Sequence, residues 1–278
     1  MEKAIICASC ENTISENFCS VCGEKRLLKH DFALKEYIEE SIEGISHFDN
    51  KFFRTSKLLF IRPGLLTHYF STGRRVKYLK PFQLFLICNL LFFLLAGKLN
   101  IFSQSISNFY QYKPYTYFNT KEAVDSKADN ANDANMLAQA FNERVGTQSK
   151  VYIAIFIPIF GLCFALLFRN TKRYFSEHLV FATHYFSFIL LYYTLFTILV
   201  LKPFYWITGI NFSSTFDLVS SFGSLILLSW YFIAAAKRFY HNTGGFVIIK
   251  ALFTIILFMI SLYAYRLLLF FWIINGIH

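Results

Sequence analysis

The sequence predicts an all-α integral membrane protein with about five transmembrane helices, preceded by a polar N-terminal third. Two observations lead to this class. Hydrophobic residues make up 55% of the 278 residues and charged residues only 16%, whereas ordinary globular proteins have about 25% charged residues. The chain after Pro81 also contains five apolar stretches of the length that crosses a bilayer. The same composition excludes disordered, collagen-like and disulfide-scaffold classes.

Four of the six cysteines form two Cys-x-x-Cys pairs near the N-terminus. Cys7 and Cys10 form the first pair, Cys19 and Cys22 the second, and eight residues separate them. Four thiolates make the tetrahedral shell of structural zinc, whereas catalytic zinc normally has His or carboxylate ligands and an open position. We expect no secretory signal before them, so these thiols stay reduced in the cytoplasm. We therefore predict a zinc ribbon over residues 1–28, with zinc as the cofactor.

Residues 29–81 are predicted to form a cytoplasmic amphipathic helical hairpin that lies on the inner leaflet. From Asp31 to Phe52, apolar residues recur at spacings of three and four, the period of one helical face. Pro63 and Gly64 break this pattern, and a second short helix, residues 65–70, can end near Gly73.

The hairpin carries eight basic residues between positions 51 and 80 and no acidic one. The candidate lipid- or phosphate-binding residues are Arg62, Arg74, Arg75, Lys77 and Lys80. Near anionic headgroups each such charge contributes about 1 kcal/mol of binding. The alternative is that the charges only hold the cytoplasmic side in place. Binding to nucleic acid is disfavoured, because the aromatic residues here alternate with aliphatic ones that suit a membrane interface.

The hairpin also resembles a known family. The pattern HDF(x15)FDNKFFRT(x6)RPG(x8)GRRVKYLKPF, residues 30–82, is similar to the signature of an uncharacterised bacterial membrane family, domain of unknown function 3667. Members resemble this chain in having a four-cysteine ribbon, then this basic block, then several spans, and the Glu177–Phe181 segment is also similar. The resemblance implies a bacterial membrane protein and brings no activity, substrate or catalytic residue.

The apolar stretches and their flanking charges predict a topology. The transmembrane bundle is expected over residues 82–278, with spans at about 82–102, 151–168, 179–201, 218–236 and 246–271. Basic residues before the first span and after the second and fourth place the N-terminus inside, and an odd number of spans places the C-terminus outside. Residues 103–150 then form an extracytoplasmic loop, which we interpret as a cap or partner surface. The last segment is either one long tilted span or a span with an interfacial tail.

Few ionisable groups are available for chemistry within the bundle. After Lys150 the carboxylates are Glu177 and Asp217, both at predicted span ends. Glu177 and His184 are two helical turns apart and share a face, so with His241 they could form an interfacial acid/base or metal cluster. The plainer interpretation is that these histidines are hydrogen-bonded inside a helix bundle. No catalytic motif is recognised, so we predict no catalytic residues.

These features favour a non-enzymatic membrane adaptor or regulator. Its zinc ribbon and basic hairpin would bind a partner protein or anionic lipid at the bacterial inner membrane. The alternative is a small transporter or lipid-handling protein with a site between the helices, although ion-coupled transport usually needs mid-membrane carboxylates. The sequence does not indicate an oligomeric state.

Overall fold

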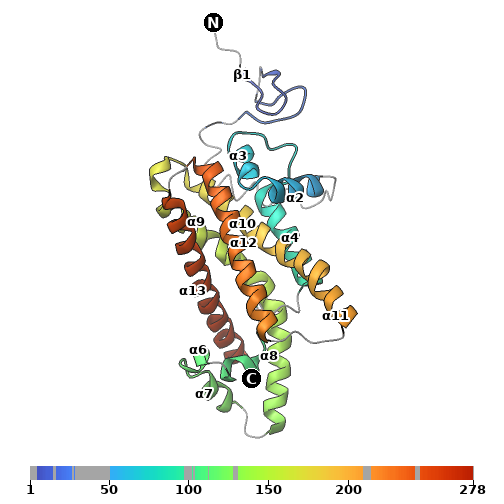
Figure 1. Ribbon diagram of the computed structural model, residues 1–278, viewed down its shortest axis with the longest axis vertical. Helices are drawn as coiled ribbons and strands as arrows, with labels where there is room; N and C mark the ends of the chain where they lie inside the picture. The colour runs from blue at the N-terminus through green and yellow to red at the C-terminus, as the bar shows by residue number, and fades with distance from the viewer. Residues whose placement is uncertain are drawn as a thin grey trace. The chain divides into compact units, whose positions relative to one another are not determined.

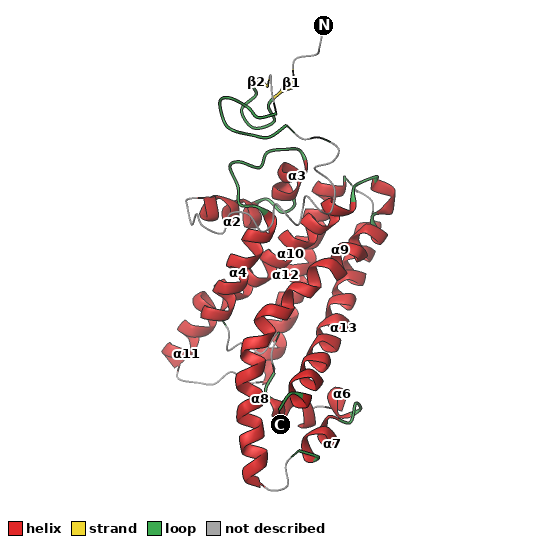
Figure 2. Ribbon diagram, turned by 180° about the vertical axis from the view of Figure 1, so that it is seen from behind, coloured by secondary structure: helices red, strands yellow, loops and turns green. Residues whose placement is uncertain are grey.

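The computed structural model is mostly helical (Figures 1 and 2). It describes residues 5–14, 17–26, 28, 51–96, 102, 104–111, 113–127, 131–208, 214–241 and 245–277. Residues 31–50 of the helix predicted from Asp31 to Phe52 lie outside this part of the chain. The chain divides into two compact units, each considered by itself. They are unit 1, Met1–Leu91 with Ile157–Phe253, and unit 2, Phe92–Phe156 with Thr254–His278.

The described chain contains four helical runs that are long and apolar enough to cross a membrane. They are Asn132–Leu167, Phe175–Ile207, Val219–Tyr240 and Phe246–Asn275. This confirms the predicted all-α class with membrane-capable helices. Helix α4 (Pro81–Leu95), where we expected a first span reaching residue 102, has 15 residues. It is therefore about 22 Å long, shorter than a hydrocarbon core of about 30 Å.

Unit 1 combines a small β-hairpin with a helix bundle. Its elements are β1 (Ile5–Ile6), β2 (Thr13–Ile14), α2 (Lys51–Ile61), α3 (Leu65–Ser71), most of α4, α9 (Phe156–Leu167), α10 (Phe175–Phe196), α11 (Lys202–Thr208), α12 (Ser214–Tyr240) and the first turns of α13 (Phe246–Asn275). Helices α2 and α3 pack against α10, and α3 also packs against α12 (Figure 1). Helix α3 corresponds to the short helix predicted over residues 65–70.

Helix α10 lies at the centre of unit 1 and is buried along most of its length. Three of its hydroxyl groups are satisfied within the helix: those of Thr183, Ser187 and Thr194 donate to carbonyl oxygens four residues earlier, at 2.7, 2.7 and 2.8 Å. Such pairing suits a span, because lipid offers no water as a partner. A π-helical turn, Thr197–Leu201, ends α10 before Pro203, which lacks the N–H that a continuous α-helix would use.

Unit 2 contains the region predicted as an extracytoplasmic loop, and its described part is largely helical. Its elements are the end of α4, α5 (Ile106–Gln111), α6 (Lys113–Thr116), α7 (Thr120–Asp125), α8 (Ala131–Tyr152) and the rest of α13. Aromatic rings form its core: Phe109 stacks on Phe270, with ring centroids 4.5 Å apart, and both contact Phe141. Arg266, which interrupts the last apolar segment, donates to the Tyr115 hydroxyl at 3.2 Å.

The turn Arg62-Pro63-Gly64 joins α3 closely to α12 within unit 1. Gly64 has a φ of +77°, and a Cβ at this position would lie 2.4 Å from the carbonyl oxygen of Ala235. The Pro63 carbonyl accepts a hydrogen bond from Arg238 Nη1 at 2.6 Å. A side chain at residue 64 would therefore be strained by its backbone conformation and would clash with the backbone of α12.

We predict that Gly64→Ala destabilises the protein by at least about 2 kcal/mol, because left-handed strain costs about 1–2 kcal/mol and the clash adds to it. Thermal unfolding of the detergent-solubilised full chain measures this. Gly223→Ala is the matched control, since Gly223 lies within α12 and a Cβ there meets no atom within 4 Å. The control should be neutral or stabilising by up to about 1 kcal/mol. Equal melting temperatures for both variants would contradict the close-approach argument.

Candidate metal centre and its contact with the basic segment

The four N-terminal cysteines lie on two turns with the same hydrogen-bond pattern. The backbone carbonyl of Cys7 accepts a hydrogen bond from the N–H of Glu11 at 3.0 Å, and the N–H of Cys7 donates to the Asn12 carbonyl at 2.8 Å. Cys19 makes the same pair of bonds with Gly23, at 2.9 Å, and the Glu24 carbonyl, at 2.8 Å. The fifth residue of each turn has positive φ, 64° at Glu11 and 72° at Gly23. At Gly23 this conformation carries no steric penalty, because glycine has no Cβ.

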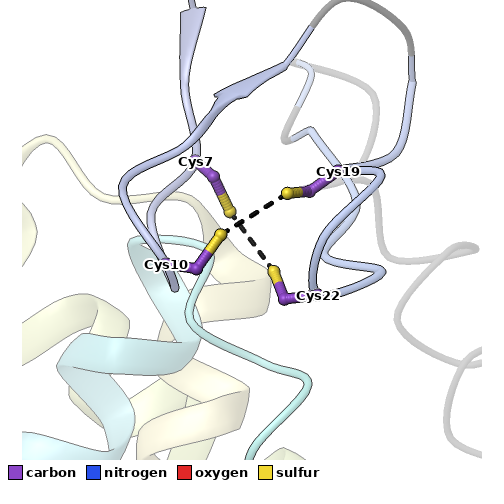
Figure 3. Close-up of side chains that lie close together, drawn as sticks. All are labelled: Cys7, Cys10, Cys19 and Cys22. Atoms are coloured by element: carbon purple, nitrogen blue, oxygen red, sulfur yellow. Dashed lines mark hydrogen bonds between the residues drawn. The ribbon is translucent and has the colours of Figure 1, made fainter.

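The two turns bring their four sulfur atoms together (Figure 3). All four Sγ atoms lie within 4.8 Å of one another, and the distances from Cys7 to Cys22 and from Cys10 to Cys19 are both 3.5 Å. A tetrahedral ion with metal–sulfur bonds of about 2.3 Å separates its ligands by about 3.8 Å, whereas disulfide sulfurs are about 2.05 Å apart. The geometry therefore fits a four-thiolate metal site.

The surroundings of the sulfurs also suit a metal. The side-chain amide of Asn12 donates to Cys10 Sγ at 3.5 Å, and the hydrogen bonds from Asn12 lower the pKa of that thiol, which favours the thiolate that binds metal. Despite a backbone hydrogen bond from Glu24 that lowers it, the pKa of Cys22 is raised by burial and the neighbouring thiols. The core of this head, residues 5–26, consists of Ile5, Ile14 and the four cysteines. So small a core supplies little folding energy, and metal binding commonly supplies it in domains of this kind.

The head contacts the basic segment through one buried carboxylate. Glu24 is 3% exposed. Its Oε2 atom accepts hydrogen bonds from the backbone N–H groups of Arg75 at 2.9 Å and Val76 at 3.1 Å. It also accepts one from the Ser9 hydroxyl at 2.5 Å. A single carboxylate thus links the cysteine turns to the loop between α3 and α4.

The predicted lipid-binding residues occupy this loop and the preceding turn, and they differ in exposure. Arg62, Arg74 and Lys77 are exposed, whereas Arg75 and Lys80 are partly buried. The guanidinium of Arg75 lies 4.2 Å from the centre of the Phe70 ring, and its Nε donates to the Phe70 carbonyl at 3.1 Å. The structure therefore assigns Arg75 to packing and leaves Arg62, Arg74 and Lys77 as the accessible charges of this set.

A buried threonine closes the loop on α2. Thr55 is fully buried, and its hydroxyl oxygen accepts a hydrogen bond from the N–H of Leu79 at 3.0 Å while donating to the Lys51 carbonyl at 2.6 Å. The next residue, Lys80, donates its N–H to the Gln83 side chain at 3.3 Å, at the start of α4. The loop that carries the exposed charges is consequently fixed at both ends.

Glu177, His184 and His241 do not form a metal cluster. Among the described residues, the four cysteines are the one group of three or more His, Cys, Asp or Glu whose ligand atoms are close enough to hold an ion. Glu177 pairs with Arg173 at 2.7 Å and caps α10 by accepting from the N–H of Tyr174 at 3.0 Å. These contacts give Glu177 a structural role at the end of the helix.

The histidines have separate partners. The Nδ1 atom of His184, which is 3% exposed, lies 2.8 Å from the Thr67 hydroxyl of α3. The imidazole of His241 meets that of His68 edge to face, with ring centroids 6.0 Å apart. Burial, followed by His241 and nearby arginines, lowers the pKa of His68. The contact of His184 fits the plainer interpretation, in which a histidine is hydrogen-bonded inside a helix bundle, whereas His241 is exposed after the end of α12.

The comparisons with known proteins point to the basic segment. Residues 49–93 match the family described as "Protein of unknown function (DUF3667)", which confirms the resemblance inferred from the sequence. The matched range contains α2, α3, most of α4 and the loop whose backbone amides donate to Glu24. No curated protein and no solved structure matches the chain. The match identifies a shared structural segment and carries no activity.

We predict that the purified full chain carries one metal ion per chain, because the four sulfurs converge on one point. Elemental analysis checks this. Cys19→Ser/Cys22→Ser should lose the ion, whereas Cys88→Ala/Cys163→Ala, which removes two buried cysteines outside the cluster, should keep it. Metal that persists in the Cys19/Cys22 variant, or is absent from the unaltered chain, would exclude the site.

Proposed function

We propose that this chain is a non-enzymatic membrane adaptor or regulator whose metal head and basic loop face the anionic surface of the bacterial inner membrane. The observation that carries the proposal is the fixed loop between α3 and α4. It presents Arg74 and Lys77 to solvent directly before α4, while the head is attached to the same loop through Glu24. Positive charge held next to a membrane helix is well placed for anionic headgroups.

We further propose that the ion in the head is zinc. Four thiolates in tetrahedral arrangement are typical of structural zinc, because such a shell leaves no open position for catalysis. Bound zinc would supply folding energy to a head whose own core is small. The role of the ion would then be to organise a surface.

We propose a topology in which α4 counts as a fifth, short span, with the N-terminus in the cytoplasm and the 103–150 region outside. The α4 helix of 15 residues would be accommodated by local thinning of the bilayer or by snorkelling of flanking residues such as Lys80. The basic residues of the loop support this orientation, because Lys and Arg accumulate on the cytoplasmic side. The C-terminus would then be extracytoplasmic.

A transport role receives less support from the described residues. The hydroxyls of the central helix α10 donate to its own backbone, so they do not present free donors to a path between the helices. After Lys150 both carboxylates of the sequence, Glu177 and Asp217, lie near helix ends. Mid-membrane carboxylates, which ion-coupled transporters normally use, are therefore not provided by this part of the chain.

The topology predicts a labelling pattern in intact cells. A cysteine at the exposed position Asn135 should react with an impermeant thiol reagent, whereas one at the exposed position Thr72 should not. The unaltered chain should give no signal, because Cys88 and Cys163 are buried and the other cysteines belong to the cytoplasmic head. Labelling at Thr72→Cys without labelling at Asn135→Cys would reverse the orientation.

The lipid proposal predicts that phosphatidylglycerol binds and stabilises the full chain in neutral detergent. Arg74→Gln/Lys77→Gln should weaken this binding roughly 30-fold, since two charges contribute about 1 kcal/mol each. A thermal-shift titration measures the affinity. High salt should reduce the difference, because the Debye length shortens from about 10 Å at 0.1 M to about 3 Å at 1 M.

Lys113→Gln/Lys121→Gln is the matched control, because it removes two exposed positive charges from unit 2. It should leave the affinity within about twofold of the unaltered chain if the loop is the binding surface. An equal loss in both variants would mean that only net charge matters. An affinity unchanged by Arg74→Gln/Lys77→Gln would show that the loop does not bind lipid, and a protein partner at the head would then be the better hypothesis.

A further inference from the structure

The loop between α3 and α4 has the form of a backbone anion-binding site. The N–H groups of two successive residues, Arg75 and Val76, converge on one oxygen atom of Glu24. Successive amides that point at a single anion form a nest, an arrangement that binds phosphate and other oxyanions. A carboxylate of this protein occupies the nest, so the two amides bind a negatively charged group.

The turn that presents these amides is fixed by its own hydrogen bonds. Gly73 has a φ of +89°, and the N–H of Arg74 donates to the Tyr69 carbonyl at 2.8 Å. After the nest, the N–H of Tyr78 donates to the Arg75 carbonyl at 3.1 Å. The geometry of the nest therefore does not depend on the head alone.

The charges around the nest exceed what one carboxylate needs. The exposed side chains of Arg74 and Lys77 flank it: the Arg74 guanidinium lies 5.2 Å from the centre of the Tyr69 ring, and the hydrogen bonds of Glu24 to the loop come from backbone amides. A phosphate group brings more acceptor oxygens than a carboxylate and forms strong, charge-assisted hydrogen bonds with Arg and Lys. The local chemistry thus suits a phosphate mono- or diester.

We propose that residues 74–77 form a phosphate-binding site and that Glu24 is its intramolecular occupant. A phosphate group and the metal head would compete for the same two amides, so binding of phosphate would release the head from the loop. This inference rests on the proposed function, because it names the phosphate of an anionic lipid headgroup as the chemistry recognised at the membrane. A soluble phosphate ester shares that chemistry.

The tethering of Glu24 sets the conditions for this competition. A carboxylate on the same chain acts at high effective concentration, so a dilute phosphate would seldom displace it. A membrane surface supplies phosphate groups at high local density, and α4 begins directly after the loop. In a zwitterionic headgroup the attached ammonium group neutralises the phosphate, whereas in an anionic headgroup the negative charge is uncompensated, so release of the head would respond to the anionic lipid content of the membrane.

Hydrogen exchange at Arg75 and Val76 tests the proposal on the full chain in zwitterionic nanodiscs. Glu24→Ala should speed the exchange of these two amides about tenfold or more, since hydrogen bonds to charged acceptors are among the stronger ones. Added glycerol phosphate, or phosphatidylglycerol placed in the nanodisc, should then slow the exchange again. Chloride at equal ionic strength should not.

Controls separate the nest from the general state of the head. Glu11→Asn removes another carboxylate of the head at an exposed position, tolerates the positive φ there and should leave the exchange unchanged. The metal content of Glu24→Ala shows whether its head stays folded. We expect the metal to be retained, because the hydrogen bond from the Cys19 N–H goes to the backbone carbonyl of residue 24, which the substitution leaves in place. If the alanine variant loses metal, Glu24→Gln, which keeps the side-chain volume, takes its place.

The outcomes distinguish the possible sources of phosphate and the two proposals. Recovery with glycerol phosphate alone would assign the site to soluble esters, and recovery with phosphatidylglycerol alone would assign it to lipid. Unchanged exchange in Glu24→Ala, or no recovery with either phosphate, would overturn the site. The lipid affinity of Arg74→Gln/Lys77→Gln is a separate measurement. The proposed lipid binding can therefore be contradicted while the phosphate site is confirmed, and the phosphate site can be contradicted while lipid binding is confirmed.

Discussion

The approach of Gly64 to the backbone of Ala235 is the constraint on which the arrangement of unit 1 depends. Only a residue without a side chain fits there, with its φ of +77° and a virtual Cβ at 2.4 Å from the Ala235 carbonyl oxygen. Two hydrogen bonds secure the same junction, from Arg238 to the Pro63 carbonyl at 2.6 Å and from Tyr231 to the Leu59 carbonyl at 3.1 Å. The chain on either side of the turn is thereby fixed to α12, a helix apolar and long enough to cross a membrane.

The position of the charged loop follows from this junction. With α3 held against α10 and α12, the loop starts at a defined point, and the Thr55 hydroxyl holds its far end through the N–H of Leu79. The backbone N–H groups of Arg75 and Val76 in this loop then donate hydrogen bonds to Glu24 of the head. A change in the metal state of the head and a change in the anions near the loop would each alter the same pair of hydrogen bonds, so the two are thermodynamically linked.

Local sequence patterns predicted the parts of this structure that local physics determines. The spacing of Cys7, Cys10, Cys19 and Cys22 predicted the cluster, and apolar length predicted the long helices. Glu24, Thr55 and Arg238 were not recognised, because their partners lie 51 and 52, 24 and 175 residues away, and periodicity carries no information about such contacts. Glu177 and His184, which share a helical face, were expected together, and this limit explains the error for His184 alone, since the partner of Glu177 is local. Arg173, four residues earlier, pairs with the first, and Thr67, 117 residues away, contacts the second.

The central claim is that the metal head and the basic loop together form an anion-responsive surface at the membrane. Native mass spectrometry of the full chain, released from nanodiscs with equal amounts of zwitterionic and anionic lipid, tests this claim most directly. We predict one metal ion per chain together with preferentially retained phosphatidylglycerol, and further retention of anionic lipid in the Glu24→Ala variant. Equal retention of both lipid classes, unaffected by Glu24, would contradict the account.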